Sequence, residues 1–337
     1  MMGILGKLFG QEPKSSGDYI NRGNDHLKKG QYDQAISDYN KAIEINPRDA
    51  EAYCYRGFAY GRKGQYDQVI SDSTEAIEID PRFAQAYCNR GAVYAGKGEY
   101  DLAISDCNKA IEINPRDPAS YNNRGSAYDA KGQYDQAISD YNKAIEINPR
   151  YTDAYSNRGL VYYNKGEYDQ AILDYNKAIG IDPRDPAPYN NRGSAYDAKG
   201  QYDQAISDYN KAIEINPRYA EAYYNRGNAY GKKGEHDQAI TDYNKAIEIN
   251  PRYTEAYSNR GNAYGKKGEH DLAILDYTKA LDINPSFALA YHNRAVAYYG
   301  KGEYNKAWED THKAQSLGYQ VSPELLKKLR EASGREK

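Results

Sequence analysis

The chain has 337 residues and a formal net charge of −3, with 45 Lys plus Arg against 48 Asp plus Glu. This near-neutral balance argues against a nucleic-acid-binding protein, because such proteins are usually clearly basic. The sequence contains no run of 18 apolar residues and only three cysteines, which excludes a membrane-spanning helix and a fold built on disulfide bonds.

The chain begins with a short apolar segment, Met1 to Gly10. It is too short for the apolar region of a secretory signal, and Lys7 stands where a myristoylation site requires Ser or Thr. Three interpretations of this start remain open. Residues 1–15 are a flexible start, or they cover the first repeat, or residues 2–10 contact a membrane surface or a partner.

A repeat of 34 residues fills most of the remaining chain. With Ser16 as position 1, nine repeats cover residues 16–321, and eight of them carry proline at position 32. The repeats begin at residues 16, 50, 84, 118, 152, 186, 220, 254 and 288.

Each repeat predicts two helices. The first covers about positions 2–14 and ends at Gly in position 15, and Asp117 and Asp185, each followed by Pro, are suited to cap its start. The second helix is expected to begin at an N-capping Asp in position 18, replaced by Asn305 in the ninth repeat, and to stop before the proline.

Small residues recur at positions 8, 20 and 27, where two helices must approach closely. Tyrosine recurs at positions 4, 11, 17 and 24, which together hold 30 of the 38 tyrosines. We interpret these tyrosines as packing residues, so no cofactor is needed to explain them.

This pattern of an early aromatic residue, Gly at positions 8 and 15, Tyr at 11, Ala at 20 and 27 and Pro at 32 resembles the tetratricopeptide repeat. The resemblance covers 306 of the 337 residues. It implies an all-α fold, a right-handed superhelical solenoid of antiparallel helix pairs without independent domains. The ninth repeat departs from the others, with Trp308 at position 21 and Thr311 at position 24.

The residues after the ninth repeat predict one more helix, opened by Ser322 with Pro and Glu after it. Its leucines form one apolar stripe: Leu325, Leu326 and Leu329. Because the last unit of a solenoid otherwise exposes its stacking surface, we interpret residues 322–332 as a capping helix and 333–337 as a tail.

Position 7 is Arg and position 23 is Asp in all nine repeats, from Arg22 and Asp38 to Arg294 and Asp310. In an antiparallel pair, position 7 lies near position 23 of the same or a neighbouring repeat. Since an unpaired buried charge is costly, we expect each Arg to form an ion pair with an Asp.

The resemblance places the first helix of each pair on the concave side, with positions 2, 5, 6, 9, 12 and 13 pointing inward. Position 6 is Asn in eight repeats: Asn21, Asn89, Asn123, Asn157, Asn191, Asn225, Asn259 and Asn293. In some groove-binding members of the family, a ladder of such Asn side chains holds a peptide main chain. The alternative is that each Asn hydrogen-bonds to a neighbouring turn.

Five inward aromatic side chains are not required by packing and are candidate anchors for a partner: Tyr55, Phe58, Tyr163, Tyr224 and Tyr299. Inward charges of both signs favour a mixed-charge partner: Glu51, Asp129, Asp153, Asp197, Glu221 and Glu255 against Arg62, Lys232 and Lys266. Positions 2 and 5 carry no Lys, which argues against the clamp for a C-terminal carboxylate found in other members.

The five histidines are scattered without the spacing of metal ligands, and the repeats leave no room for a catalytic domain. The cysteines are expected to be buried free thiols, as in a cytoplasmic protein. The sequence therefore predicts a non-enzymatic scaffold or adaptor, without cofactor or metal, that binds extended peptides or partner proteins in its groove. The alternative is a structural scaffold that self-associates through its repeat ends or N-terminal segment.

Overall fold

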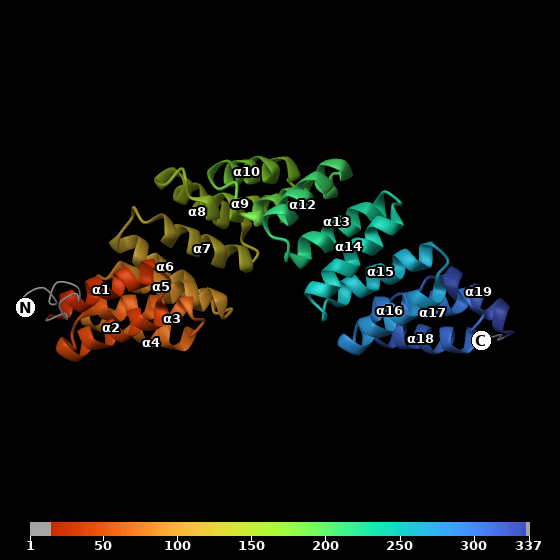
Figure 1. The fold of residues 1–337 in the computed structure, drawn as a ribbon, viewed down its shortest axis with the longest axis horizontal. Helices are drawn as coiled ribbons and strands as arrows, with labels where there is room; N and C mark the ends of the chain where they lie inside the picture. Colours follow the sequence, from red (N-terminus) through yellow and green to blue (C-terminus); the bar gives the residue numbers. More distant parts are fainter. Residues whose placement is uncertain (1–14, 335–337) are drawn as a thin grey trace, which may run out of the picture. The chain divides into compact units, whose positions relative to one another are not determined.

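The computed structural model describes residues 15–334, and all regular secondary structure in that range is α-helical. The chain divides into two compact units, one up to Val161 and one from Tyr162 onward. In each unit, antiparallel helix pairs follow one another along the chain (Figure 1). The interpretations of residues 1–10 and of the last three residues lie outside the described range.

The first unit contains the first four helix pairs and the start of α9. Its helices are α1 (Ser16–Lys28), α2 (Tyr32–Ile45), α3 (Ala50–Arg62), α4 (Tyr66–Ile79), α5 (Ala84–Gly96), α6 (Tyr100–Ile113), α7 (Pro118–Ala130), α8 (Tyr134–Ile147) and α9 (Thr152–Asn164).

The second unit contains the end of α9 and the remaining helices. They are α10 (Tyr168–Ile181), α11 (Pro186–Ala198), α12 (Tyr202–Ile215), α13 (Ala220–Lys232), α14 (His236–Ile249), α15 (Thr254–Lys266), α16 (His270–Ile283), α17 (Ala288–Gly300), α18 (Tyr304–Ser316) and α19 (Pro323–Ser333). None of the helices between residues 15 and 334 is long and apolar enough to span a membrane.

The turn inside each pair is made by the glycine at position 15. These glycines have positive φ, from 71° at Gly30 to 81° at Gly234, a conformation that other residues rarely adopt. Asp117 and Asp185 cap the helices that follow them, with proline at the first helical residue. These two predictions are confirmed.

The prediction that Asp at position 18 caps the second helix is wrong. The second helices begin at position 17, so this Asp is their second residue, and the residue before the helix makes no side-chain cap. The Asp pairs instead with Lys at position 14 of the next repeat, as in Lys97–Asp67 (2.9 Å) and Lys233–Asp203 (2.8 Å). A negative charge in the first helical turn is favourable there without being the cap.

Tyrosine at position 24 packs directly on glycine at position 8. A Cβ atom added at Gly193 would lie 2.7 Å from the ring of Tyr209, so only glycine fits. The ninth repeat has Ala295 and Thr311 at these two positions, and both side chains are buried. The expected packing role of these tyrosines is confirmed.

The three cysteines are buried free thiols, and all lie in the first unit: Cys54, Cys88 and Cys107. Burial raises the pKa of Cys54 to about 12 and that of Cys88 to about 11. These thiols are therefore shielded and protonated in the folded chain.

Helix α19 packs against the ninth helix pair. Ser322 caps it, and Leu325 and Leu329 are buried in a cluster with Trp308. The indole Nε1 of Trp308 donates a hydrogen bond to Ser333 Oγ at 3.1 Å. The apolar end of the ninth repeat is thus covered by this helix.

Candidate functional site

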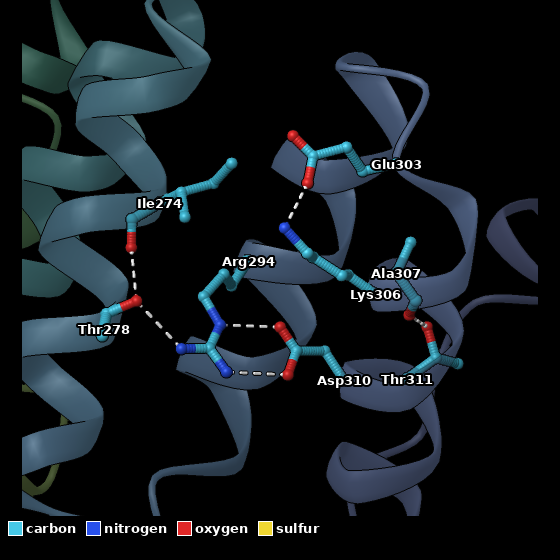
Figure 2. Close-up of polar contacts among 8 residues, drawn as sticks. All are labelled: Ile274, Thr278, Arg294, Glu303, Lys306, Ala307, Asp310 and Thr311. Carbon is cyan, nitrogen blue, oxygen red and sulfur yellow. Dashed lines mark hydrogen bonds and ion pairs between the residues drawn. The ribbon is translucent and has the colours of Figure 1, made fainter.

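Arginine at position 7 joins three helices. In the ninth repeat, Arg294 Nε and Nη2 donate to the two carboxylate oxygens of Asp310 at 2.7 and 2.8 Å. Its Nη1 donates to Thr278 Oγ1 at 2.9 Å in the second helix of the preceding repeat (Figure 2). One guanidinium group therefore holds its own repeat together and binds it to the previous one.

The predicted ion pair is confirmed in eight repeats: Arg22–Asp38, Arg56–Asp72, Arg90–Asp106, Arg124–Asp140, Arg192–Asp208, Arg226–Asp242, Arg260–Asp276 and Arg294–Asp310. The guanidinium group also lies over the Tyr ring at position 4, for example 5.5 Å from the ring centroid of Tyr223 for Arg226. With its donors used in this way, position 7 is structural and is not a candidate anion site.

Within each unit the first helices of successive repeats contact one another, as α3 does with α5 and α13 with α15. Successive second helices in the same unit make no comparable contact. The layer of first helices is therefore the more closely spaced one, as on the inner side of a curved stack. In each unit, we call the exposed surface of this layer the first-helix face.

In six repeats, asparagine at position 6 donates a hydrogen bond to a side chain in the first helix of the preceding repeat. Asn225 Nδ2 donates to Asn190 Oδ1 at 3.1 Å, and Asn89 Nδ2 donates to Cys54 Sγ at 3.4 Å. The partner is a helix side chain and not a turn. Asn225 donates one of its two amide hydrogens in this way, and in residues 15–334 its Oδ1 accepts no side-chain hydrogen bond.

Four of the five aromatic candidates are half-buried against other rings. Tyr224 packs on Tyr253 with 4.9 Å between centroids, and its hydroxyl accepts a hydrogen bond from Asn259 at 3.1 Å. The other three ring contacts are Tyr55 with Tyr39, Tyr163 with Tyr168 and Tyr299 with Tyr304.

Phe58, at position 9, differs because 43% of its surface is exposed. Two further exposed apolar residues at position 9, Leu160 and Val296, were not singled out from the sequence. Their shared position 9 is the sequence feature from which they could have been predicted as exposed apolar residues of the same kind as Phe58.

Two neighbouring pockets open on the first-helix face of the second unit. One of about 390 Å³ lies between α13 and α15 and is lined by residues including Gly231, His236 and Lys266. The next, of about 420 Å³, lies between α15 and α17 beside Gly265 and His270. Glycine at position 12 leaves the space for both pockets, and the histidines at position 17 lie at their walls.

The asparagine at position 9 in the first pocket has a fixed orientation. Asn228 Oδ1 accepts hydrogen bonds from the Tyr243 hydroxyl at 2.8 Å and from Asn259 Nδ2 at 2.9 Å. With its oxygen engaged twice, the amide group of Asn228 is held in one orientation.

Two of the remaining histidines, His292 and His312, stack on aromatic rings. His292 stacks on Tyr319 with 4.8 Å between ring centroids, and burial lowers its pKa. Between residues 15 and 334, no three His, Cys, Asp or Glu side chains are placed to hold a metal ion.

Family models for the TPR repeat and the tetratricopeptide repeat match successive segments of the chain. The matched residues are 23–64, 126–166, 193–234 and 227–268; 84–117, 152–185 and 254–287; 107–139, 174–207 and 276–309; and 50–83. The chain belongs to the tetratricopeptide repeat family.

Solved structures of tetratricopeptide repeat type are similar to this chain. The APC/C hetero-tetramer Cut9–Hcn1 is 16% identical with a TM-score of 0.63, covering 94% of this chain and 76% of the other. A tetratricopeptide repeat protein from Parabacteroides merdae is 21% identical with a TM-score of 0.57, covering 74% and 98%. MamA is 34% identical with a TM-score of 0.45, covering 49% and 96%.

No curated protein matches the chain closely enough to count as a relative. The tetratricopeptide repeat fold is that of a protein-interaction scaffold, and proteins or peptides are its general class of partner.

Proposed function

We propose that this tetratricopeptide repeat protein is a non-enzymatic adaptor that binds an extended polypeptide segment along its first-helix face. The observation that carries the proposal is the pair of pockets, one repeat apart, between α13, α15 and α17. Pockets that recur once per repeat suit side chains placed at intervals along an extended chain.

Exposed apolar side chains at position 9 add the second part of the argument. Phe58, Leu160 and Val296 are each at least 40% exposed on the first-helix face. Apolar side chains of this kind supply binding energy when a partner removes them from water. The buried free thiols fit a reducing compartment such as the cytoplasm.

The proposal is tested with peptides selected from a displayed library of random linear sequences on the full chain. The variant Phe58→Ala/Leu160→Ala/Val296→Ala removes the three exposed apolar side chains at position 9 of the first helices. We expect it to weaken the selected peptides by at least about tenfold, since a buried apolar anchor contributes more than about 1.4 kcal/mol. Isothermal titration calorimetry measures the loss.

The matched control is Leu102→Ala/Leu173→Ala/Leu272→Ala, which removes three leucines of similar exposure from second helices. Binding should survive in this control. If the control loses binding and the first variant keeps it, the working surface is formed by the second helices and the proposal is wrong.

The alternative, self-association through the repeat ends, predicts growth in particle size with concentration. In the structure, α19 already covers the apolar end of the ninth repeat. Light scattering that shows a single monomeric species over a wide concentration range would remove this alternative, whereas a concentration-dependent increase in mass would favour it.

A further inference from the structure

At the interface between the sixth and seventh repeats, a lysine is paired with a carboxylate of the preceding repeat. Lys232, at position 13 in α13, forms an ion pair with Asp197, at position 12 in α11. The Lys232 ammonium also lies 6.0 Å from the ring centroid of Tyr202, at position 17. A cation at position 13 thus reaches back to positions 12 and 17 of the preceding repeat.

One repeat later, the lysine at the equivalent position has neither of these partners. Lys266 occupies position 13 in α15, but position 12 is Gly231 and position 17 is His236. Throughout residues 15–334, no carboxylate forms an ion pair with Lys266. The pocket of about 390 Å³ lies beside Gly231, where the carboxylate-bearing side chain would be.

The acidic groups around this pocket are engaged elsewhere. Glu235 pairs with Lys233 and Glu269 with Lys267, each at 2.8 Å. Asp237 also pairs with Lys267 at 2.8 Å. These carboxylates therefore do not neutralise the charge of Lys266, and the His236 side chain adds a second polar group to the wall of the pocket.

We propose that the pocket between α13 and α15 receives the carboxylate of an acidic side chain from the bound segment, which pairs with Lys266 as Asp197 pairs with Lys232. The inference rests on the proposed function, because it identifies the chemistry of the segment that binds the first-helix face. A partner with Asp or Glu in this register is preferred over a neutral one.

The test uses three synthetic decapeptides and the full chain. One alternates Glu and Ser and is capped at both ends, and the second replaces each Glu by Gln. The third is the Gln peptide with a free C-terminal carboxylate. We expect the capped Glu peptide to bind about tenfold more tightly than the capped Gln peptide, because hydrogen bonds to charged groups are the stronger ones.

Three variants locate the effect. Lys266→Gln should abolish the preference for Glu, and Gly231→Asp should abolish it by supplying the internal carboxylate. A Cβ at Gly231 would meet only the Tyr243 hydroxyl, at 3.8 Å, so this substitution fits the fold. Arg62→Gln is the matched control, since Arg62 is also a cation at position 13 but lies over the ring of Tyr32; it should keep the preference.

The outcomes separate the two proposals. If the capped Glu and Gln peptides bind equally well, or if Lys266→Gln keeps the preference, the carboxylate pocket is wrong and the peptide-binding face stands. If the free C-terminal carboxylate binds better than the Glu side chains, the side-chain assignment is wrong. If neither capped peptide binds but the library-selected peptides do, the inference alone fails; if no peptide binds at all, both fail.

Discussion

The interior repeats and the ninth repeat solve the same packing problem in different ways. In an interior repeat, isoleucine at position 21 packs against the next repeat, as Ile206 does with Ala229. In the ninth repeat, Trp308 takes that position and packs against Leu325 and Leu329 of α19. A large aromatic side chain and one short amphipathic helix thus replace a whole neighbouring repeat.

The same two regions differ in their internal core. The interior repeats with tyrosine at position 24 need glycine at position 8, whereas the ninth combines Thr311 with Ala295. The combined volume of the side chains at positions 8 and 24 matters more than the volume of either one, because the space between the helices is fixed.

The largest expected effect is a loss of stability above about pH 10, which comes from the repeats with a buried tyrosine at position 24 and not from the ninth repeat. Burial raises the pKa of Tyr141, Tyr209 and Tyr277 above the usual value for tyrosine. Above about pH 10 the unfolded chain releases these protons while the folded chain retains them, so stability falls as pH rises. Each phenol contributes at most about 1.4 kcal/mol per pH unit.

Urea unfolding at about pH 9 and about pH 11, followed by circular dichroism, measures this loss. Absorbance of the phenolate reports the same groups, and Tyr209→Phe should reduce the pH dependence. If these tyrosines ionise near pH 10 without any loss of helix, their burial does not control the alkaline limit.

The next effect concerns the contact unique to the ninth repeat. Trp308→Ala should cost about 3–5 kcal/mol, because it removes the aromatic group that joins α18 to α19. The interior counterpart Ile206→Val should cost only about 1 kcal/mol. Urea unfolding compares the two, and equal costs would mean that α19 adds little to stability.

The third prediction concerns the ion pair between Arg at position 7 and Asp at position 23, which the interior repeats and the ninth repeat share. Arg226→Leu and Arg294→Leu should each cost about 3 kcal/mol, because each leaves a buried aspartate unpaired. Replacing the aspartate as well, in Arg226→Leu/Asp242→Leu, should recover most of the loss. A double variant as unstable as the single one would show that the pair contributes more than charge neutralisation.

The smallest effect comes from exchanging the small residues at position 8. Gly193→Ala should cost about 1–3 kcal/mol through contact with the Tyr209 ring. In the ninth repeat the reverse change, Ala295→Gly, should cost about 1 kcal/mol through helix propensity. Thermal unfolding measures both, and Gly193→Ala raising the melting temperature would contradict the close contact.

The fold was readable from the sequence because each turn is marked by a residue with one physical role. Glycine at position 15 has a positive φ, so its recurrence locates the end of each first helix. The sequence predicts the wrong role for aspartate at position 18 because its partner, a lysine at position 14, belongs to the next repeat. Sequence pattern within one repeat does not reveal a contact between repeats.

The candidate site is harder to predict from the sequence than the fold, for a related reason. Tyr224 occupies an inward position, but its exposure depends on Tyr253 and Asn259 from neighbouring segments. Lys232 and Lys266 have the same repeat position, and only the structure shows that one is paired and the other is not. Such differences arise from combinations of residues across two repeats.

The three buried cysteines make local opening of the first unit measurable. Cys54, Cys88 and Cys107 are buried in the first unit, where burial also raises their pKa. A thiol reagent can modify them only in moments when the surrounding helices separate. The rate at which each thiol reacts therefore reports how often repeats two and three open in the unmodified protein.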